Sequence, residues 1–207
     1  MKKYIFFCTL SVFGLLAQLC QAQKINVGVA YGLAYTDLNY DEPDSPINLG
    51  FPQIGTFVNF EVDMKLPKNR YFGVGFARQQ HQNTINFNGD LGSGQTGLVL
   101  SDYNNLYQKD FYDIHFRKVF SNKFQFTFGA FYFRENYNTV TTEVIDNQIV
   151  YTISQTENRD DNLGLFASGD YLWPLNNFLD AGVKARIYFS IDGIESLVLS
   201  PTIRAKF

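Results

Sequence analysis

Two histidines and a few carboxylates are the side chains of this sequence that could do acid-base chemistry. His115 lies between Asp113 and Arg117 in an alternating run, and His81 follows a separate alternating run. Catalysis by a serine, a histidine and an acid needs a base within hydrogen-bond reach of the nucleophile, and only these two histidines are available. We interpret His115 as part of a polar interior. We expect His81 to face water, where its strand leaves the apolar layer.

The remaining candidates also favour a structural interpretation. Glu61 and Asp63 form a pair of carboxylates, but the chain supplies enough basic partners to make a salt-bridged network the simpler explanation. Gly92-Ser93-Gly94 is a flexible loop with no helix after it to hold a phosphate, and no 12-residue calcium loop is present. We therefore predict no catalytic, cofactor-binding or metal-binding residues.

The elements that position these side chains are strands. Apolar and polar residues alternate with a period of two, which places successive side chains on opposite faces of a sheet. The last run, Leu197–Phe207, alternates to its final aromatic residue. Eight such segments are recognisable: 25–35, 58–66, 72–79, 112–117, 124–135, 163–173, 179–189 and 197–207.

The connections alternate between short and long. Residues 67–70, 121–123 and 174–177 are rich in turn formers, whereas residues 36–53, 82–105 and 136–161 are long and residues 190–196 are intermediate. Short turns at one end and long loops at the other are typical of transmembrane barrels. The pattern predicts an all-β protein, an eight-stranded antiparallel up-and-down transmembrane β-barrel with short periplasmic turns and long extracellular loops.

Charge decides which face points inward. The polar faces carry six acidic and six basic residues, and a closed interior needs this balance because an unpaired buried charge costs several kcal/mol. The acidic residues are Glu61, Asp63, Asp113, Glu135, Asp170 and Asp180, and the basic ones are Lys65, Arg117, Lys184, Arg186, Arg204 and Lys206. We expect small residues such as Gly73 and Gly75 to leave room for the long side chains. The alternative is a soluble, lipocalin-like carrier with its apolar face inside.

Aromatic residues support the membrane orientation. Phe72, Phe120, Phe124, Trp173 and Phe207 lie beside short turns or at the end of the last strand, where an interfacial girdle belongs. Basic residues at the same level, Lys68, Arg70, Lys118 and Lys123, could extend toward lipid headgroups.

The N-terminal segment predicts export. Lys2 and Lys3 precede a mostly apolar stretch, and small residues before Gln23 suit a cleavage site. We predict a signal peptide over residues 1–22 and a barrel domain over residues 23–207. Removing the signal would remove Cys8 and Cys20, the only two cysteines, and leave 15 basic against 20 acidic residues. That mild negative charge argues against a nucleic-acid partner.

One long connection is predicted to project from the barrel. Residues 137–156 alternate on both sides of Asp146-Asn147, as in a hairpin with a two-residue turn. The connection over residues 82–105 has a weaker pattern of the same kind. The long and intermediate connections together carry 13 acidic residues against one basic residue, Arg159, which predicts a solvated face that disfavours anionic partners.

With its signal, eight strands, tight turns and terminal aromatic residue, the chain resembles the small Gram-negative outer-membrane barrels of OmpA/OmpX type, in the outer membrane protein beta-barrel domain family. The resemblance implies the cell outer membrane as location, contact with outer-membrane lipid and lipopolysaccharide, and recognition of Phe207 by the outer-membrane assembly machinery. Functions in this family are mixed. Lipid A deacylases on barrels of this size use a His-x-Ser pair, whereas His115 is followed by Phe116 and Arg117, and His81 by Gln82 and Asn83.

We therefore expect a monomeric structural or surface-interaction protein, not an enzyme, whose projecting hairpin binds an extracellular protein partner by adhesion. A narrow channel and a lipid-modifying outer-membrane enzyme that uses His115 or Ser168 are the alternatives, beside the soluble carrier.

Overall fold

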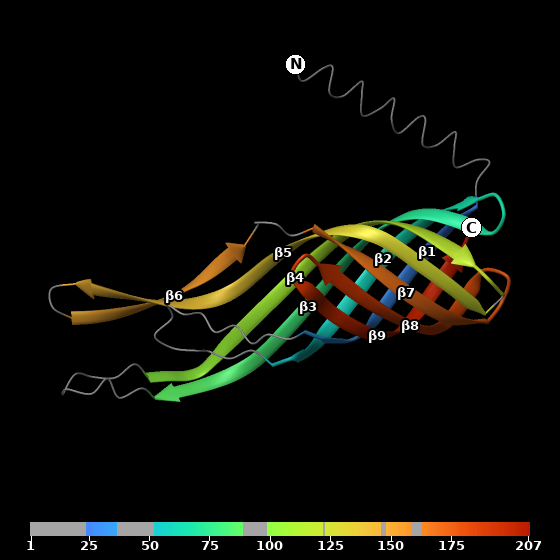
Figure 1. The fold of residues 1–207 in the computed structure, drawn as a ribbon. Helices are drawn as coiled ribbons and strands as arrows, with labels where there is room; N and C mark the ends of the chain where they lie inside the picture. Colours follow the sequence, from blue (N-terminus) through green and yellow to red (C-terminus); the bar gives the residue numbers. More distant parts are fainter. Residues whose placement is uncertain (1–23, 37–51, 89–98, 122, 146–147, 159–162) are drawn as a thin grey trace, which may run out of the picture.

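The chain folds into one antiparallel sheet that closes on itself (Figure 1). A computed structural model describes residues 24–36, 52–88, 99–121, 123–145, 148–158 and 163–207. The strands are β1 (Ile25–Tyr35), β2 (Ile54–Leu66), β3 (Arg70–Asn88), β4 (Val99–Val119), β5 (Phe124–Ile145), β6 (Gln148–Asn158), β7 (Leu163–Pro174), β8 (Leu179–Ser190) and β9 (Gly193–Lys206). In these ranges no helix is long and apolar enough to cross a membrane.

The strand order is β4-β3-β2-β1-β9-β8-β7-β5-β6, and a further pairing of β4 with β5 closes the cylinder. Of the nine strands, β6 pairs with the far end of β5, beyond the stretch of β5 that pairs with β7. The other eight strands form the barrel, as the sequence predicts. Closure leaves no free sheet edge around the cylinder, which a wall in lipid requires.

The first and last strands form the closing seam. The Ile25 amide donates to the Phe207 carbonyl at 3.2 Å, and the Phe207 amide donates back to the Ile25 carbonyl at 2.8 Å. From there the register runs without interruption through Val29 and Ile203, so residues far apart in the sequence are direct neighbours. This position is where the sequence predicts the end of the final strand.

The polar face points inward and the apolar face points outward. Glu61 is 1% exposed and Arg186 is 3% exposed, whereas Phe60 is 49% exposed and Val183 is 39% exposed. A soluble carrier would show the reverse, so that alternative is wrong. Because the exposed wall is apolar over most of its circumference and height, its stable surroundings are hydrocarbon.

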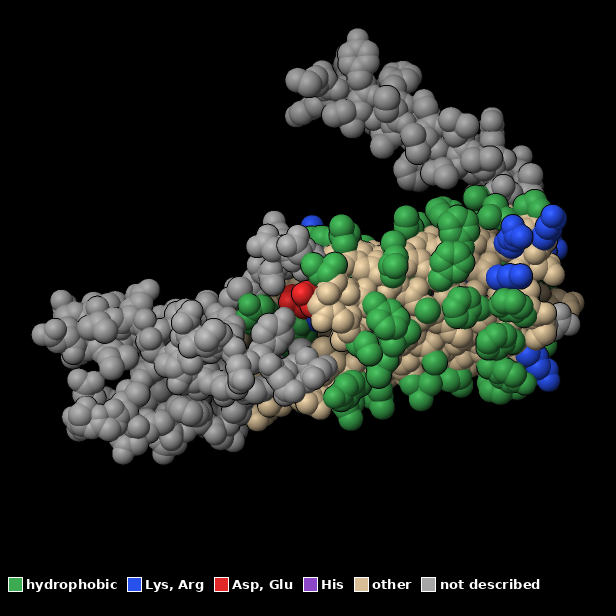
Figure 2. All heavy atoms as spheres, in the orientation of Figure 1, with side chains coloured by type: hydrophobic (Ala, Val, Ile, Leu, Met, Phe, Trp, Pro, Cys, Tyr) green, Lys and Arg blue, Asp and Glu red, His purple; other side chains and the backbone are tan. Residues whose placement is uncertain are grey.

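The visible wall has a banded surface (Figure 2). Hydrophobic side chains cover the cylinder, and Lys and Arg gather at the end that holds the short turns and the C-terminus (Figures 1 and 2). Such a basic band beyond the apolar wall lies at the level of lipid headgroups.

Short turns join the strands at the end of the barrel where Ile25 pairs with Phe207, which is called the seam end below. Between β2 and β3, the three-residue connection 67–69 contains Lys68 and Asn69 with positive φ angles of 62° and 55°, which gives a tight reversal. At the opposite end the connection of β8 to β9 is also tight, because β8 extends to Ser190 and β9 begins at Gly193. The sequence predicts an intermediate loop over residues 190–196, and that prediction is wrong. Gly193 has a φ of 123°, which only glycine adopts readily.

Three strands are much longer than the barrel needs. Strands β3, β4 and β5 contain 19, 21 and 22 residues, whereas about 9–11 residues suffice to cross a bilayer. Their far ends project from the barrel as two hairpins, β3–β4 and β5–β6 (Figure 1). Both projections are predicted from the sequence. The tips, residues 89–98 and 146–147, lie outside the described residues, as do the Gly92-Ser93-Gly94 loop and most of the acidic connections.

Candidate functional site

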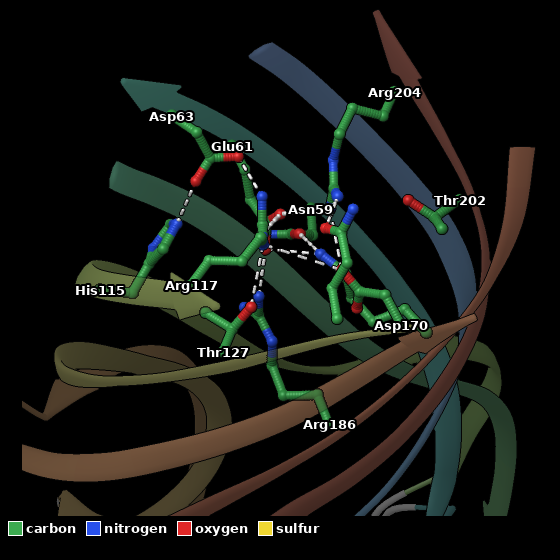
Figure 3. Close-up of polar contacts among 12 residues, drawn as sticks. Asn59, Glu61, Asp63, His115, Arg117, Thr127, Asp170, Arg186, Thr202 and Arg204 are labelled. Atoms are coloured by element: carbon green, nitrogen blue, oxygen red, sulfur yellow. Dashed lines mark hydrogen bonds and ion pairs between the residues drawn. The ribbon is translucent and has the colours of Figure 1, made fainter. Parts of the chain in front are cut away.

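The lumen near the seam end is filled by an ionic layer centred on Glu61 of β2 (Figure 3). One oxygen of Glu61 lies 2.5 Å from Arg117 Nη2 of β4, and the other lies 2.6 Å from Lys184 Nζ of β8 and also pairs with Arg186. Arg204 of β9 approaches to 4.0 Å. Three strands, β4, β8 and β9, thus bring four cations to one carboxylate of β2, because the period of two points all five side chains to the axis.

His115 is a structural member of the same layer. Its Nε2 lies 2.9 Å from Asp63 Oδ1 and its Nδ1 lies 2.5 Å from Asp113 Oδ1, and the ring is 1% exposed. Asp63 also accepts a hydrogen bond from Arg117. Both ring nitrogens are therefore engaged with carboxylates, and the imidazole is enclosed away from the lipid-facing wall. This placement confirms the interpretation of His115 as part of a polar interior.

The charges of the layer balance. Arg204 Nη2 donates to Asp170 Oδ2 at 2.8 Å and Nη1 donates to Gln125, while Arg117 Nε donates to Thr127 Oγ1 at 2.9 Å. The layer holds four carboxylates (Glu61, Asp63, Asp113 and Asp170) and four basic side chains (Arg117, Lys184, Arg186 and Arg204). Buried ions in such a balanced set are tolerated because each has a partner.

Glycines on β3 make the space for this layer. A Cβ at Gly73 would lie 2.5 Å from both Asp63 Oδ1 and His115 Nε2, and one at Gly75 would collide with the Asp113 carboxylate. The expectation that small inward residues leave room for long ones is confirmed at both positions.

Above the ionic layer, an aromatic layer fills the lumen. Phe111 stacks on Tyr188 at a centroid distance of 4.3 Å, and Phe131 meets Tyr188 edge-on at 5.1 Å. The layer consists of Phe57, Phe111, Phe131, Phe133, Phe166 and Tyr188, each at most 4% exposed. Arg186 joins the two layers, since its guanidinium lies 4.5 Å from the Phe166 centroid and donates to the Tyr188 hydroxyl at 2.9 Å.

The aromatic layer is a departure from the predicted polar interior. The alternation assigns Phe131, Phe133, Phe166 and Tyr188 to the inward face, but nothing in the sequence shows that they meet at one height. Phe57 and Phe111 precede the segments recognised as alternating, and only the longer strands of the structure include them. The lumen is therefore polar near the seam end and apolar above it.

A second polar group occupies the mouth of the barrel. Lys109 Nζ lies 2.8 Å from Glu135 Oε1 and 2.5 Å from Glu195 Oε2, and Tyr107 donates to Glu135 at 2.7 Å. The Lys109 ammonium also lies 4.8 Å from the Phe133 ring centroid, directly over the aromatic layer. Lys109 and Glu195 lie outside the alternating segments, so the sequence prediction missed them.

His81 belongs to this mouth, and the prediction that it faces water is wrong. The ring is 0% exposed, with Nδ1 lying 2.7 Å from the Pro52 carbonyl oxygen and Nε2 lying 2.5 Å from the Gln79 amide. Strand β3 continues well past His81, so the inward phase is kept above the membrane. Burial, together with the nearby Lys109 ammonium, lowers the pKa of His81 despite the contact with Pro52.

Outward-facing residues mark the upper membrane boundary. On the wall, the aromatic side chains Phe76 and Tyr112 pack at 5.4 Å, and two positions further up Arg78 donates to both oxygens of Asp110 at 2.7 and 2.8 Å. The Asp110 carboxylate raises the pKa of Arg78. Ion pairs do not face hydrocarbon, so the bilayer ends between these two rows.

Above the boundary the two hairpins separate. The pairing of β4 with β5 ends at Tyr107 and Tyr137, and further out β4 pairs with β3 while β5 pairs with β6. Asn138 Nδ2 donates to the Asn104 carbonyl across the gap at 3.3 Å. Among the described residues, the strand pairing thus no longer joins β4 to β5 beyond Tyr107 and Tyr137.

Within the described part of the chain, the two residues considered for catalysis, Ser168 and His115, lie inside the filled lumen. Ser168 is 3% exposed inside the lumen, and the hydrogen bonds of His115 are made to Asp63 and Asp113. No group of three or more His, Cys, Asp or Glu residues suited to a metal ion occurs within the described ranges.

The comparisons with known proteins identify a fold and no relative in sequence. No family model matches the chain, and no curated protein is similar to it. The crystal structure of Ail, the attachment invasion locus protein of Yersinia pestis, in complex with the heparin analogue sucrose octasulfate covers 89% of this chain and 99% of that chain, at 7% identity and a TM-score of 0.52. Neisserial surface protein A covers 89% and 97% at 11% identity, with a TM-score of 0.49.

The fold is that of the small eight-stranded outer-membrane barrels of OmpA/OmpX type. The apolar wall, the charged lumen and the likeness to the Ail structure agree on this class. The protein is accordingly an integral membrane β-barrel of the outer-membrane type.

Proposed function

We propose that this protein is a surface-interaction barrel, in which a sealed cylinder anchors the projecting hairpin β5–β6 for adhesion to an extracellular protein. The observation that carries the proposal is the separation of the hairpins above Tyr107 and Tyr137. Exposed strand edges present unsatisfied amides and carbonyls, to which an extended segment of a partner can add as a further strand.

The filled lumen supports an anchor more than a pore. The ionic layer and the aromatic layer lie one above the other across the interior, and their side chains are almost fully buried. A protein that conducts would need a continuous wet path, whereas one that displays hairpins needs a rigid base. No enzymatic role is proposed.

Ail, whose name refers to attachment and invasion, lends the proposal support by analogy of fold. The structure of Ail contains a polysulfated heparin analogue. In this chain the long and intermediate connections carry 13 acidic residues and one basic residue. Because like charges repel, we propose a neutral or cationic protein segment, and not a polyanion, as the partner.

Export and assembly complete the proposal. Residues 1–22 would direct export and be removed, residues 23–207 would form the mature monomer, and Phe207 would be read by the assembly machinery. Outer-membrane lipid and lipopolysaccharide would surround the wall.

The test is to shorten the hairpin without disturbing the barrel. Tyr137 and Thr156 face each other in the β5–β6 ladder, so residues 138–155 can be replaced by Asn-Gly, which favours a two-residue turn. Bacteria that display this variant should lose attachment to a layer of cultured epithelial cells, while the purified protein keeps the heat-modifiable gel migration of a closed barrel.

The second hairpin provides the matched control. Thr84 and Asn104 are also paired, so residues 85–103 can be replaced by Asn-Gly in the same way. Attachment should survive this change. Full attachment after removal of residues 138–155 would refute the proposal.

A further inference from the structure

A furrow of about 600 Å³ crosses the lipid-facing wall. Its sides are two rows of outward side chains that follow the pairing of β1, β9, β8 and β7. The upper row is Tyr35, Leu197, Ile187 and Ala167, and the lower row is Leu33, Leu199, Ala185 and Gly169. It begins at the extracellular ends of β1 and β2 and descends toward Phe126 on β5.

The furrow exists because large side chains are missing from β7 and β8. Ala167, Gly169 and Ala185 occupy neighbouring outward positions, whereas most outward positions of the wall carry larger apolar residues. A Cβ at Gly169 would meet only Phe124, at 3.8 Å, so a side chain fits there without collision. From β1 to β5 the furrow crosses four strand spacings, roughly 19 Å, which exceeds the ~15 Å half-thickness of the hydrocarbon layer.

A small polar pocket adjoins the upper end of the furrow. It has a volume of about 220 Å³ and shares Leu33 and Ile54 with the furrow, and its polar side chains are Thr56, Gln80 and Gln82. These side chains are uncharged. The neighbouring cation, Arg78, donates through Nε and Nη2 to the Asp110 carboxylate, which neutralises its charge. The pocket therefore offers hydrogen bonds to hydroxyl groups and little attraction to a phosphate.

We propose that the furrow and the pocket together form a site for one molecule of an outer-leaflet glycolipid. One acyl chain lies in the furrow, and a sugar hydroxyl group of the headgroup bonds to the pocket. The furrow is continuous with the wall that contacts lipid, so an acyl chain is the occupant that its surroundings supply. Lipid tails are as apolar as leucine, so a smooth wall selects no particular chain, whereas a furrow adds contacts on three sides.

The experiment measures retention of a defined lipid by the purified barrel. Native mass spectrometry in detergent should show saturable binding of one lipid A molecule per barrel, and lipid A without phosphate groups should bind as well as the phosphorylated form. Phosphatidylglycerol should bind at least about tenfold more weakly because it lacks the sugar. Equal binding of phosphatidylglycerol, or binding without saturation, would overturn the proposal.

Substitutions that fill the furrow test whether the lipid binds there. Gly169→Leu combined with Ala185→Leu should weaken lipid A binding by at least about tenfold, because acyl methylenes lose their contacts. Ala130→Leu adds the same bulk at an outward position outside the furrow and should leave binding unchanged. If the filled variant does not give a heat-modifiable barrel, Gln80→Ala with Gln82→Ala tests the pocket at two surface positions. Unchanged binding in the folded variant would contradict the assignment.

Discussion

At the scale of single residues, one carboxylate organises the lower half of the lumen. Glu61 contacts Arg117, Lys184 and Arg186 and lies near Arg204, and these four cations come from the three strands β4, β8 and β9. Removing one member of a buried ion pair is costly because the other members stay buried without compensation.

We expect Glu61→Gln to lower the free energy of unfolding by about 3–5 kcal/mol, because four cations would lose their shared counter-charge. Asp180→Asn is the control, since its partner Lys206 lies 2.6 Å away with a side chain that is 38% exposed. Solvent screens that pair, so the control should cost at most about 1 kcal/mol. Urea unfolding in detergent micelles, followed by fluorescence of the single tryptophan, measures both.

His81 predicts a dependence of stability on pH. Its pKa in the folded state lies below the ordinary value of 6.5, because the ring is buried. The unfolded chain therefore binds more protons as the pH falls below about 6.5, and the contribution of His81 to stability, present above that pH, is lost toward the folded-state pKa. The same unfolding experiment at pH 5 and pH 7.5 should show a smaller loss on acidification for His81→Gln than for the unchanged protein. An equal loss in both proteins would contradict this assignment.

At the scale of the elements, the inward face of β3 is shaped by its neighbours on both sides. Gly73 pairs with Asp63 of β2 and with His115 of β4, so the side chains of both partners converge over it. Its missing Cβ is thus a requirement of the ionic layer.

Gly73→Ala is expected to destabilise the barrel by about 1–3 kcal/mol, the usual cost of overpacking, since the new methyl would lie 2.8 Å from the Val62 carbonyl oxygen and closer still to two polar side chains. Gly169→Ala should be neutral or stabilising by up to about 1 kcal/mol, because its methyl makes only an ordinary contact with Phe124 and collides with nothing. Chemical denaturation of the two variants side by side measures the difference, and equal effects would show that the packing argument fails.

The sequence predicts whether a strand residue points into or out of the barrel, but not at which height along the barrel axis its side chain lies. A period of two assigns Glu61, Arg117 and Arg186 to the interior regardless of where each strand begins. Which residues share a layer depends on the stagger between strands, so the meeting of Phe111 with Tyr188 was not predictable. The error at His81 has a related origin, because the alternation that extends β3 beyond the membrane is too weak to show that His81 keeps the inward phase.

At the scale of the whole molecule, the barrel has layers along its axis. The ionic layer lies near the seam, the aromatic layer lies above it, and the Lys109 group occupies the mouth. Charged and aromatic side chains thus occupy different heights of one interior, while the wall that contacts lipid is apolar.

This layering predicts an electrically silent barrel. Planar bilayers that contain the purified protein should show no stable single-channel current, because both layers cross the lumen. Phe111→Ala with Phe131→Ala should remain silent, because Arg117, Arg186 and Arg204 still fill the lower lumen. Steady conductance from the unchanged protein would favour the narrow channel.

The pairing of Ile25 with Phe207 has a consequence for how the molecule forms. The two strands of the seam, β1 and β9, are the first and the last strands of the described chain, so the cylinder cannot close until β9 is available. Until then every partly formed sheet has two edge strands with unpaired backbone amides and carbonyls. A cell that makes this protein must protect these edges from aggregation until the barrel has closed.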